Sequence, residues 1–293
     1  MIKHIRWALV LALLVLVQSL QTTPAQTTST IELVAYNKEN QTVKDLSTND
    51  FELRVDGRMV TLDSLKWETK RPPHMILLVD TSYTAMNNKP LMKDLVTAFI
   101  DAKPPQLEMA VATIGVNQQF LSGYQQSGDE LVSSLQKVKF GGIAPLSQAI
   151  LGSITKFDPD TGASSKEVRK VIVAFSDGSD DSPADVWSEA QKTLVTRGYA
   201  FYEINHIKAM KTIFDFKYVD KDLIRLAEET GGRAFRLGGL EEIGRVARQI
   251  YDRETNTYLA TVNGDTRISA ADLNRFKIKS RRKDVRIDVV AVH

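Results

Sequence analysis

The middle of the chain alternates short apolar runs with segments of helical periodicity. Four runs are apolar without a strict two-residue alternation: MILLVD (75–80), MAVATIG (109–115), VIVAFSD (171–177) and YAFYEI (199–204). Strands of a parallel sheet show this pattern when helices bury both of their faces. We therefore expect these runs to be neighbouring strands of one sheet.

The segments between these runs carry apolar residues at helical spacing. In KPLMKDLVTAFIDAKPP (89–105), Leu91, Leu95 and Phe99 share one face, and Pro104 stops the helix. Further helices are expected at 129–138, 145–157, 182–198, 221–232 and 240–251, with a short strand at 233–237. This alternation predicts an α/β fold with a doubly wound, mostly parallel sheet flanked by helices.

The two flanks have a different pattern. Residues 30–70 and 257–293 contain short strand-like pieces around polar turns, with clear alternation at Val285, Ile287 and Val289. Neither flank has enough strands to bury a core by itself. We predict that the flanks pair with each other into one small antiparallel β domain.

The first 26 residues have the layout of a secretory signal peptide. Lys3 and Arg6 precede an apolar run from Trp7 to Val17, and small residues follow before Gln26. The run is shorter than the ~20 residues that a membrane-spanning helix needs. We expect cleavage of this segment and export to the periplasm, the cell surface or the medium, with no membrane span afterwards. A retained anchor is the alternative.

The predicted organisation follows from these patterns. Residues 1–25 form the signal peptide, 26–72 and 256–293 form the two parts of the β domain, and 73–255 form the α/β domain.

Composition narrows the chemistry. The 293 residues include no Cys, which excludes disulfides and cysteine-ligated metals. Removal of residues 1–25 takes away two basic residues and no acidic one, so the formal charge falls from +2 to 0. A neutral protein gives no electrostatic basis for nucleic-acid binding.

Three loops that follow or face strand ends carry oxygen-bearing side chains. They are Asp80 to Thr84, FGGIAPLSQ (140–148) and SDGSDDS (176–182). Ligands of open parallel sheets bind at the carboxyl ends of the strands. These loops are therefore the candidate functional site.

This constellation resembles the von Willebrand factor type A domain, and in particular a bacterial secreted subfamily. That family carries D-x-S-x-S after its first strand, a Thr before a middle helix and an Asp after its fourth strand, which together form a metal-ion-dependent adhesion site. Asp80, Ser82 and Thr84 match the first motif and Asp177 the last. The resemblance implies bound Mg²⁺ or Mn²⁺, completed by an acidic residue of a partner protein. Residues i, i+2 and i+4 of an extended turn would point the same way.

The middle loop departs from the family pattern. Where bacterial members read Gly-Gly-Thr, this chain reads Gly141-Gly142-Ile143-Ala144. Neither Ile143 nor Ala144 can ligate a cation through its side chain, so the site is degenerate, with water as the replacement ligand.

The resemblance extends over residues 30–293. Phe51 to Gly57 is similar to a stretch that precedes the A domain in the subfamily, and Tyr258-Leu259 with RFKIKS is similar to its closing β segment. Beside the ligand positions, Tyr83 and Ser179 are expected to contact the partner.

An aromatic surface is the other candidate contact. Phe214, Phe216 and Tyr218 alternate with polar residues in IFDFKYVD, which fits either a partner-binding surface or an extra edge strand.

Other acidic positions have simpler interpretations. Asn263, Asp265 and Asp272 have spacings similar to those of a Ca²⁺-binding loop, but Thr261 and Thr266 replace its key residues, which favours a polar hairpin insertion. Asp180 and Asp181 are expected in a solvated loop. Ser182 and Asp185 have the spacing of a capping box.

The function that we predict is a secreted, non-enzymatic protein-binding or adhesion module. The sequence has no P-loop, nucleophile elbow, H-E-x-x-H motif or dinucleotide fingerprint. Two alternatives stay open: a metal-independent scaffold with a vestigial site, and a metal-dependent hydrolase that uses Asp80 and Asp177.

Overall fold

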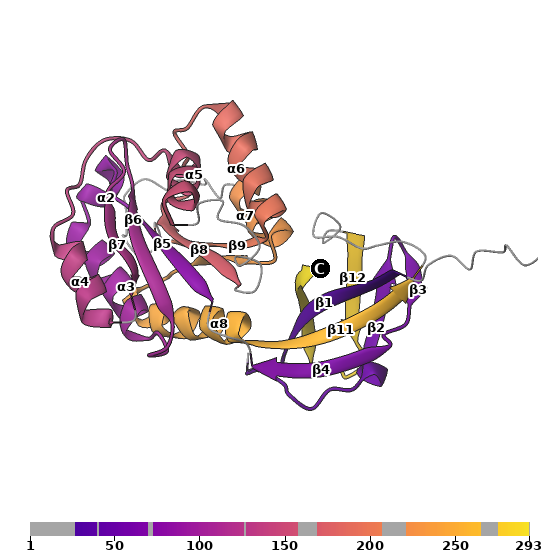
Figure 1. Ribbon diagram of the computed structural model, residues 1–293. Coiled ribbons are helices and arrows are strands. Elements are labelled where there is room, and N and C mark those ends of the chain that lie inside the picture. The colour runs from indigo at the N-terminus through magenta and orange to yellow at the C-terminus, as the bar shows by residue number, and fades with distance from the viewer. Residues whose placement is uncertain are drawn as a thin grey trace, which may run out of the picture.

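The computed structural model describes residues 27–39, 41–69, 73–125, 127–157, 169–206, 221–264 and 275–292. These residues form an α/β unit and, beside it, a unit of antiparallel strands that we call the β unit (Figure 1). The fold class predicted from the sequence is confirmed, including the pairing of the two flanks.

The α/β unit is built on a six-stranded sheet in the order β10-β9-β8-β5-β6-β7. Its parallel strands are β5 (His74–Asp80), β6 (Glu108–Ile114), β8 (Lys170–Ser176), β9 (Tyr199–Asn205) and β10 (Arg233–Arg236). An edge strand that we did not predict, β7 (Phe120–Gln125), pairs antiparallel with β6.

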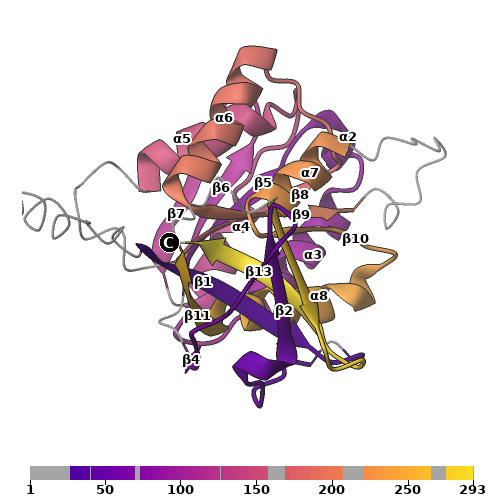
Figure 2. The ribbon, with the colours of Figure 1, turned by 90° about the vertical axis from the view of Figure 1, so that its right-hand side faces the viewer.

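Helices cover both faces of this sheet (Figure 2). On one face lie α3 (Lys89–Asp101), α4 (Gly128–Gln136) and α8 (Ile243–Thr255), and on the other α5 (Leu146–Phe157), α6 (Ala184–Arg197) and α7 (Lys221–Glu229). In β5, Met75 and Leu77 enter the first core, whereas Ile76 and Leu78 enter the second. Each such buried side chain contributes roughly 2 kcal/mol, which explains why the strand is apolar throughout.

The β unit consists of two antiparallel sheets. One has the order β13-β1-β11-β4, formed by β1 (Thr27–Tyr36), β4 (Ser64–Thr69), β11 (Asn256–Gly264) and β13 (Arg286–Val292). The other is β12-β2-β3, formed by β2 (Phe51–Val55), β3 (Arg58–Val60) and β12 (Phe276–Ser280). The two sheets share one core around Leu33, Leu53 and Tyr258.

A tight turn joins β2 to β3. Asp56 and Gly57 have φ of 49° and 79°, the left-handed values that a two-residue hairpin turn requires. The Asp-Gly pair in the sequence is therefore explained by this turn.

At one of the points where the chain passes between the two units, no linker separates them. Helix α8 ends at Thr255 and β11 begins at Asn256, as the continuous orange ribbon in Figure 1 shows. The side chains of Arg169 and Glu254 form a buried ion pair beside this crossing, with Nε and Oε2 2.6 Å apart. The residue boundaries that we assigned to the two domains stay a prediction.

Several predicted features lie outside the described residues. They are the signal peptide (1–25), the aromatic residues Phe214, Phe216 and Tyr218, and positions Asp265 and Asp272 of the polar insertion. Within the described ranges, the helices are all too short or too polar to cross a membrane.

Candidate metal centre

The candidate site lies where the sheet changes its winding direction. From the central strand β5 the chain proceeds to β6 on one side, and it returns later to place β8 on the other side. Asp80 ends β5 and Asp177 follows β8, and these two strands pair directly, with Val79 opposite Phe175. The two carboxylates are therefore brought to the same carboxyl edge of the sheet, at the switch point where open α/β sheets bind their ligands; we call this place the crevice.

Asp80 and Ser82 are buried residues of this site. Their exposed fractions are 0% and 4%, and the Ser82 N–H donates to Asp80 Oδ1 at 2.8 Å. Asp80 Oδ2 and Ser82 Oγ are buried and make no hydrogen bond of regular geometry with a described residue, although the Ser82 hydroxyl and the Asp177 N–H lie close enough to the Asp80 carboxylate to lower its pKa. A buried polar atom without a partner is costly, so these two oxygens fit a ligand that accepts lone pairs.

Helix capping does not explain the Ser82 hydroxyl. Ser82 precedes the short helix α2 (Tyr83–Met86), but its side chain makes no capping hydrogen bond. The longer helix α3 begins after Asn88, so Ser82 does not cap that helix either. The hydroxyl is thus available to a ligand in the crevice.

Thr84 departs from the geometry that we expected. The extended backbone ends at Ser82, and Tyr83 begins α2, so Thr84 lies in a helical turn and is exposed. The alternation of side chains in an extended turn therefore holds for Asp80 and Ser82 but does not continue to Thr84.

Asp177 lies beside Asp80 and is held by its own hydrogen bonds. Its Oδ1 accepts hydrogen bonds from the Ser179 N–H at 2.9 Å and from the Ser179 hydroxyl. Asn205 Nδ2 donates to the Asp177 carbonyl oxygen at 3.1 Å. Ser179, which we expected to contact a partner, thus positions the Asp177 carboxylate.

The electrostatics of the crevice favour a cation. Burial raises the pKa of Asp80 to about 6, the Ser82 N–H opposes this shift, and the charge of Asp177 adds to it. A divalent cation between the two carboxylates would offset both the burial of the Asp80 charge and its repulsion by Asp177, since the cation replaces lost hydration and separates like charges.

The middle loop supplies no side-chain oxygen at the expected position. Ile143 is 49% exposed, and Ala144 is buried with its N–H donating to Asp181 Oδ2 at 2.8 Å. The described residues also contain no group of three His, Asp or Glu side chains that could hold a metal ion. A cation here would be held by two carboxylates and by hydroxyl groups, with water in the remaining positions. Such a site suits Mg²⁺ or Mn²⁺, because these ions do not need every ligand to come from the protein.

The acidic loop after β8 has a structural task that we did not predict. Asp180 Oδ1 accepts from the Ser147 N–H at 3.2 Å, and its other oxygen accepts from the Ser147 hydroxyl. Asp180 therefore caps the N-terminus of α5, 33 positions away in the sequence. Our expectation of a solvated loop holds for Asp181, which is exposed, but not for Asp180, which is partly buried.

The capping box that we expected at the start of α6 is absent. The residue before this helix is Pro183, and no side-chain hydrogen bond caps it. The Ser182 hydroxyl instead accepts from the Gln148 N–H at 3.2 Å, so it too is directed to α5. Asp185 is exposed on the first turn of α6.

His206 is the residue near the site that sequence reasoning missed. It follows β9 directly and is fully buried. Burial lowers the pKa of His206 to about 4 although the nearby charge of Asp177 opposes this, so the imidazole is neutral at pH 7. In the sequence it stands 29 positions from Asp177, and only the adjacency of β8 and β9 brings the two together.

Apolar side chains surround the crevice at the surface. Tyr83 and Val116 are each 62% exposed. They lie against the middle loop: a Cβ placed on Gly141 would be 3.7 Å from the Tyr83 ring, and one placed on Gly142 would be 3.4 Å from the Val116 side chain. Together with Ile143 these residues form what we call the apolar rim. Exposed apolar groups beside a polar site are typical of protein-binding surfaces.

The sequence and the structure were compared with those of known proteins. No protein-family model and no curated protein matches the sequence. Among solved structures, the von Willebrand factor type A protein from Catenulispora acidiphila is 11% identical, with a TM-score of 0.50; the match covers 71% of this chain and 51% of that one. The SpRpn10 VWA domain is 18% identical, with a TM-score of 0.44 and coverage of 57% and 88%. Manganese-loaded TRAP from Plasmodium vivax is 10% identical, with a TM-score of 0.48 and coverage of 68% and 80%.

At these identities the comparison concerns the fold. The order of the strands, the two helical layers and the position of Asp80 at the end of the central strand agree with the resemblance found in the sequence. The α/β unit of this chain has the fold of a von Willebrand factor type A domain, as the match to the Catenulispora structure and the strand order show.

Proposed function

We propose that this protein is an exported, non-enzymatic binding module that captures a partner protein through a divalent cation. Asp80, Ser82 and Asp177 hold the cation, directly or through water, and Thr84 adds a hydroxyl from the edge of the crevice. A carboxylate of the partner completes the coordination. The observation that carries the proposal is the pair of buried oxygens, Asp80 Oδ2 and Ser82 Oγ, that make no hydrogen bond of regular geometry with a described residue.

The chemistry of the donors supports Mg²⁺ or Mn²⁺ as the cation. Carboxylate, hydroxyl and water oxygens are hard ligands, and Mg²⁺ commonly keeps several waters when it binds to one or two carboxylates. A site with one protein ligand fewer than its family pattern can therefore still bind, with lower affinity.

The apolar rim supports a protein as the partner. Tyr83, Val116 and Ile143 would cover apolar groups on either side of an acidic residue, whereas a small phosphoester substrate would gain little from them. No basic side chain or neutral general base is seen beside Asp80 and Asp177 in the described residues except the buried His206, which gives little basis for a hydrolase.

Calorimetric titration of MgCl₂ and MnCl₂ into EDTA-treated protein tests this proposal. We expect saturable binding that Asp80→Ala abolishes and Asp185→Ala leaves intact, since Asp185 is an exposed carboxylate near the same edge. Binding that survives Asp80→Ala, or no binding at all, would contradict the metal centre.

A metal-independent binding module is the second candidate. It is favoured by Ile143 and Ala144, which provide no hydroxyl where the family pattern has one. In that case a partner captured by the wild-type protein would be retained in EDTA and lost on Tyr83→Ser, which removes the largest side chain of the apolar rim.

A further inference from the structure

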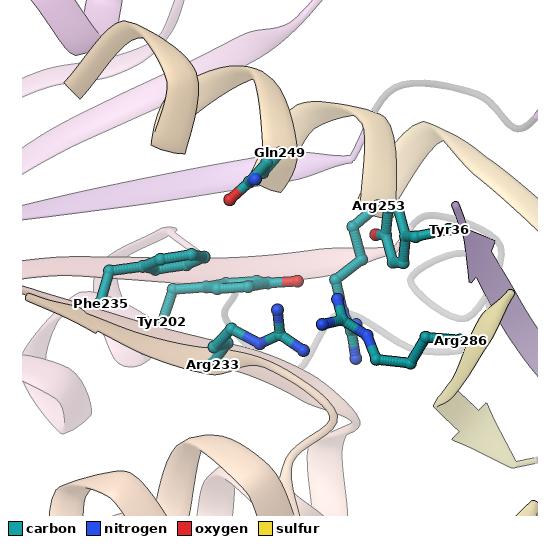
Figure 3. Close-up of a pocket in the computed structure, with 7 residues that line it drawn as sticks. All are labelled: Tyr36, Tyr202, Arg233, Phe235, Gln249, Arg253 and Arg286. Atoms are coloured by element: carbon teal, nitrogen blue, oxygen red, sulfur yellow. The ribbon is translucent and has the colours of Figure 1, made fainter. Parts of the chain in front are cut away.

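A second polar site lies between the two units, away from the residues of the metal centre. Arg233 of β10, Arg253 of α8 and Arg286 of β13 line one pocket together with Tyr36 and Tyr202. Figure 3 shows the three guanidinium groups directed toward the same space, with the Tyr202 and Phe235 rings stacked along one side. We call this space the junction pocket.

Positive charge in the junction pocket exceeds the negative charge that faces it. Asp288 is the carboxylate that all three arginines share: Arg253 Nη1 lies 2.7 Å, Arg233 Nη2 3.1 Å and Arg286 Nε 3.6 Å from its oxygens. Among the described residues, Asp288 is thus the carboxylate in ion-pair contact with these three guanidinium groups, and Glu254 acts at longer range on Arg253.

Glu254, the other carboxylate that acts on Arg253, forms its hydrogen bonds with other residues. Glu254 Oε2 accepts from Arg169 Nε at 2.6 Å, and its other oxygen accepts from the Tyr202 hydroxyl. Glu32 acts on Arg169 as well, on that side of the junction. Neither carboxylate therefore balances Arg233 or Arg286.

The three arginines differ in how much donor capacity they have left. Arg253 is 6% exposed, and its N–H groups donate to Asp288 and to the Gly231 carbonyl oxygen. The side chains of Arg233 and Arg286 are 38% and 49% exposed and contact Asp288 through one nitrogen each. Each of these two guanidinium groups retains N–H donors at the mouth of the pocket.

The neighbouring groups suit an anion. Burial raises the pKa of Tyr36 to about 12 even though Arg253 opposes this, so its phenol stays neutral and adds no negative charge. Arg286 lies over the Tyr36 ring at 5.4 Å, which holds its guanidinium toward the pocket. The pocket leaves about 10 Å³ for the centre of a water-sized sphere, room for one oxygen-sized group, with the rest of a ligand at the open mouth.

We propose that the junction pocket binds an oxyanion, a phosphate or a carboxylate, whose oxygens lie between the guanidinium groups of Arg233 and Arg286. Guanidinium groups bind both kinds of oxyanion through paired hydrogen bonds. A bound oxyanion would neutralise the excess charge and link β10 of the α/β unit to β13 of the β unit. This inference does not rest on the proposed metal centre.

Arginine modification by phenylglyoxal tests the proposal on the intact wild-type protein. The reaction is followed residue by residue by mass spectrometry in phosphate, in acetate and in chloride at equal ionic strength. We expect phosphate or acetate to slow the modification of Arg286 and Arg233 saturably, by about tenfold at ten times the dissociation constant. Arg225, whose side chain is 58% exposed, is the internal control and should react equally in all three salts.

The two oxyanions distinguish the chemistry of the ligand. Protection by phosphate alone indicates a phosphate group, and protection by acetate indicates a carboxylate. If Arg286 and Arg233 react at the same rate in all three salts, the proposal is overturned.

A variant gives an independent measurement. Thermal unfolding should show a rise in Tm with the protecting anion that Arg286→Gln loses and Arg225→Gln retains. An equal rise in both variants would assign the effect to general anion binding and would contradict the pocket.

Discussion

Arg253 Nη1 donates to Asp288 Oδ2 at 2.7 Å, and this ion pair joins the last helix of the α/β unit to the last strand of the β unit. The same guanidinium donates through Nε and Nη2 to the Gly231 carbonyl oxygen, at 3.2 and 2.8 Å. One buried side chain therefore connects three segments that are distant in the sequence.

Replacement of Arg253 by Ala should destabilise the protein by about 3 kcal/mol or more, because it removes the shortest of the three ion pairs of the Asp288 carboxylate and the guanidinium that donates to the Gly231 carbonyl. Urea unfolding measures the change. Arg225→Ala, which removes only exposed pairs with Asp222 and Glu229, should cost less than about 0.5 kcal/mol. Equal effects of the two variants would show that the ion pair is not important for stability.

The stability of the metal-free protein should depend on pH through Asp80. Its pKa in the folded protein is about 6, above the ordinary value of 3.8, so the folded state binds a proton more readily than the unfolded chain. The contribution of Asp80 to the free energy of unfolding therefore falls as pH rises from 3.8 to about 6, by on the order of 3 kcal/mol in total.

Asp80→Asn isolates this contribution. In EDTA at pH 8 the variant should be more stable than the wild type, and at pH 4 the difference should largely disappear. Saturating Mn²⁺ at pH 8 should reverse the order, because only the wild type gains from the cation. Unfolding curves for the two proteins that run parallel across this pH range would contradict the assignment.

Restoring a hydroxyl in the middle loop should strengthen the metal site. Ile143→Thr places a ligand at one of the two candidate positions, and we expect Mn²⁺ affinity to rise by about fivefold. Ile143→Val has the same branched shape without the hydroxyl and should leave affinity unchanged. If calorimetry shows the same affinity for both variants, position 143 does not face the cation.

The two acidic positions after β8 should separate into different tasks. Asp180→Ala removes the cap of α5 and should cost about 1–2 kcal/mol of stability while metal binding is retained. Asp177→Ala should abolish metal binding instead. Parallel unfolding and titration experiments on both variants check this, and loss of binding in Asp180→Ala with an intact fold would make Asp180 a ligand.

The fold could be predicted because its signals are local. The apolar run of β5 is continuous since Met75 and Ile76 enter different cores, and helix α3 ends before the Pro104 that stops it. The edge strand β7 was missed because its sequence, FLSGYQ, contains Ser and Gly, which interrupt an apolar run. As an edge strand, β7 pairs with only one neighbour, β6.

The contacts of the site were harder to predict because they link distant positions. Ser182 and Asp185 offered a local cap for α6, yet the hydroxyl of Ser182 accepts a hydrogen bond from the Gln148 N–H in α5, 34 positions away. The burial of His206 beside Asp177 depends on the pairing of β8 with β9, and the contacts of Arg233 and Arg253 with Asp288 depend on the packing of the α/β unit against β13. No local spacing in the sequence encodes these pairs.

Strands β4 and β11 pair antiparallel, with Thr69 opposite Asn256, so the whole α/β unit occupies the position of a hairpin loop. Closing so long a loop in an unfolded chain carries a large entropic cost. A folded α/β unit removes most of that cost, because it already holds its two ends one strand spacing apart. Folding should therefore be ordered in time, and pulse-labelled amides of β5 and β8 should be protected from exchange before those of β11.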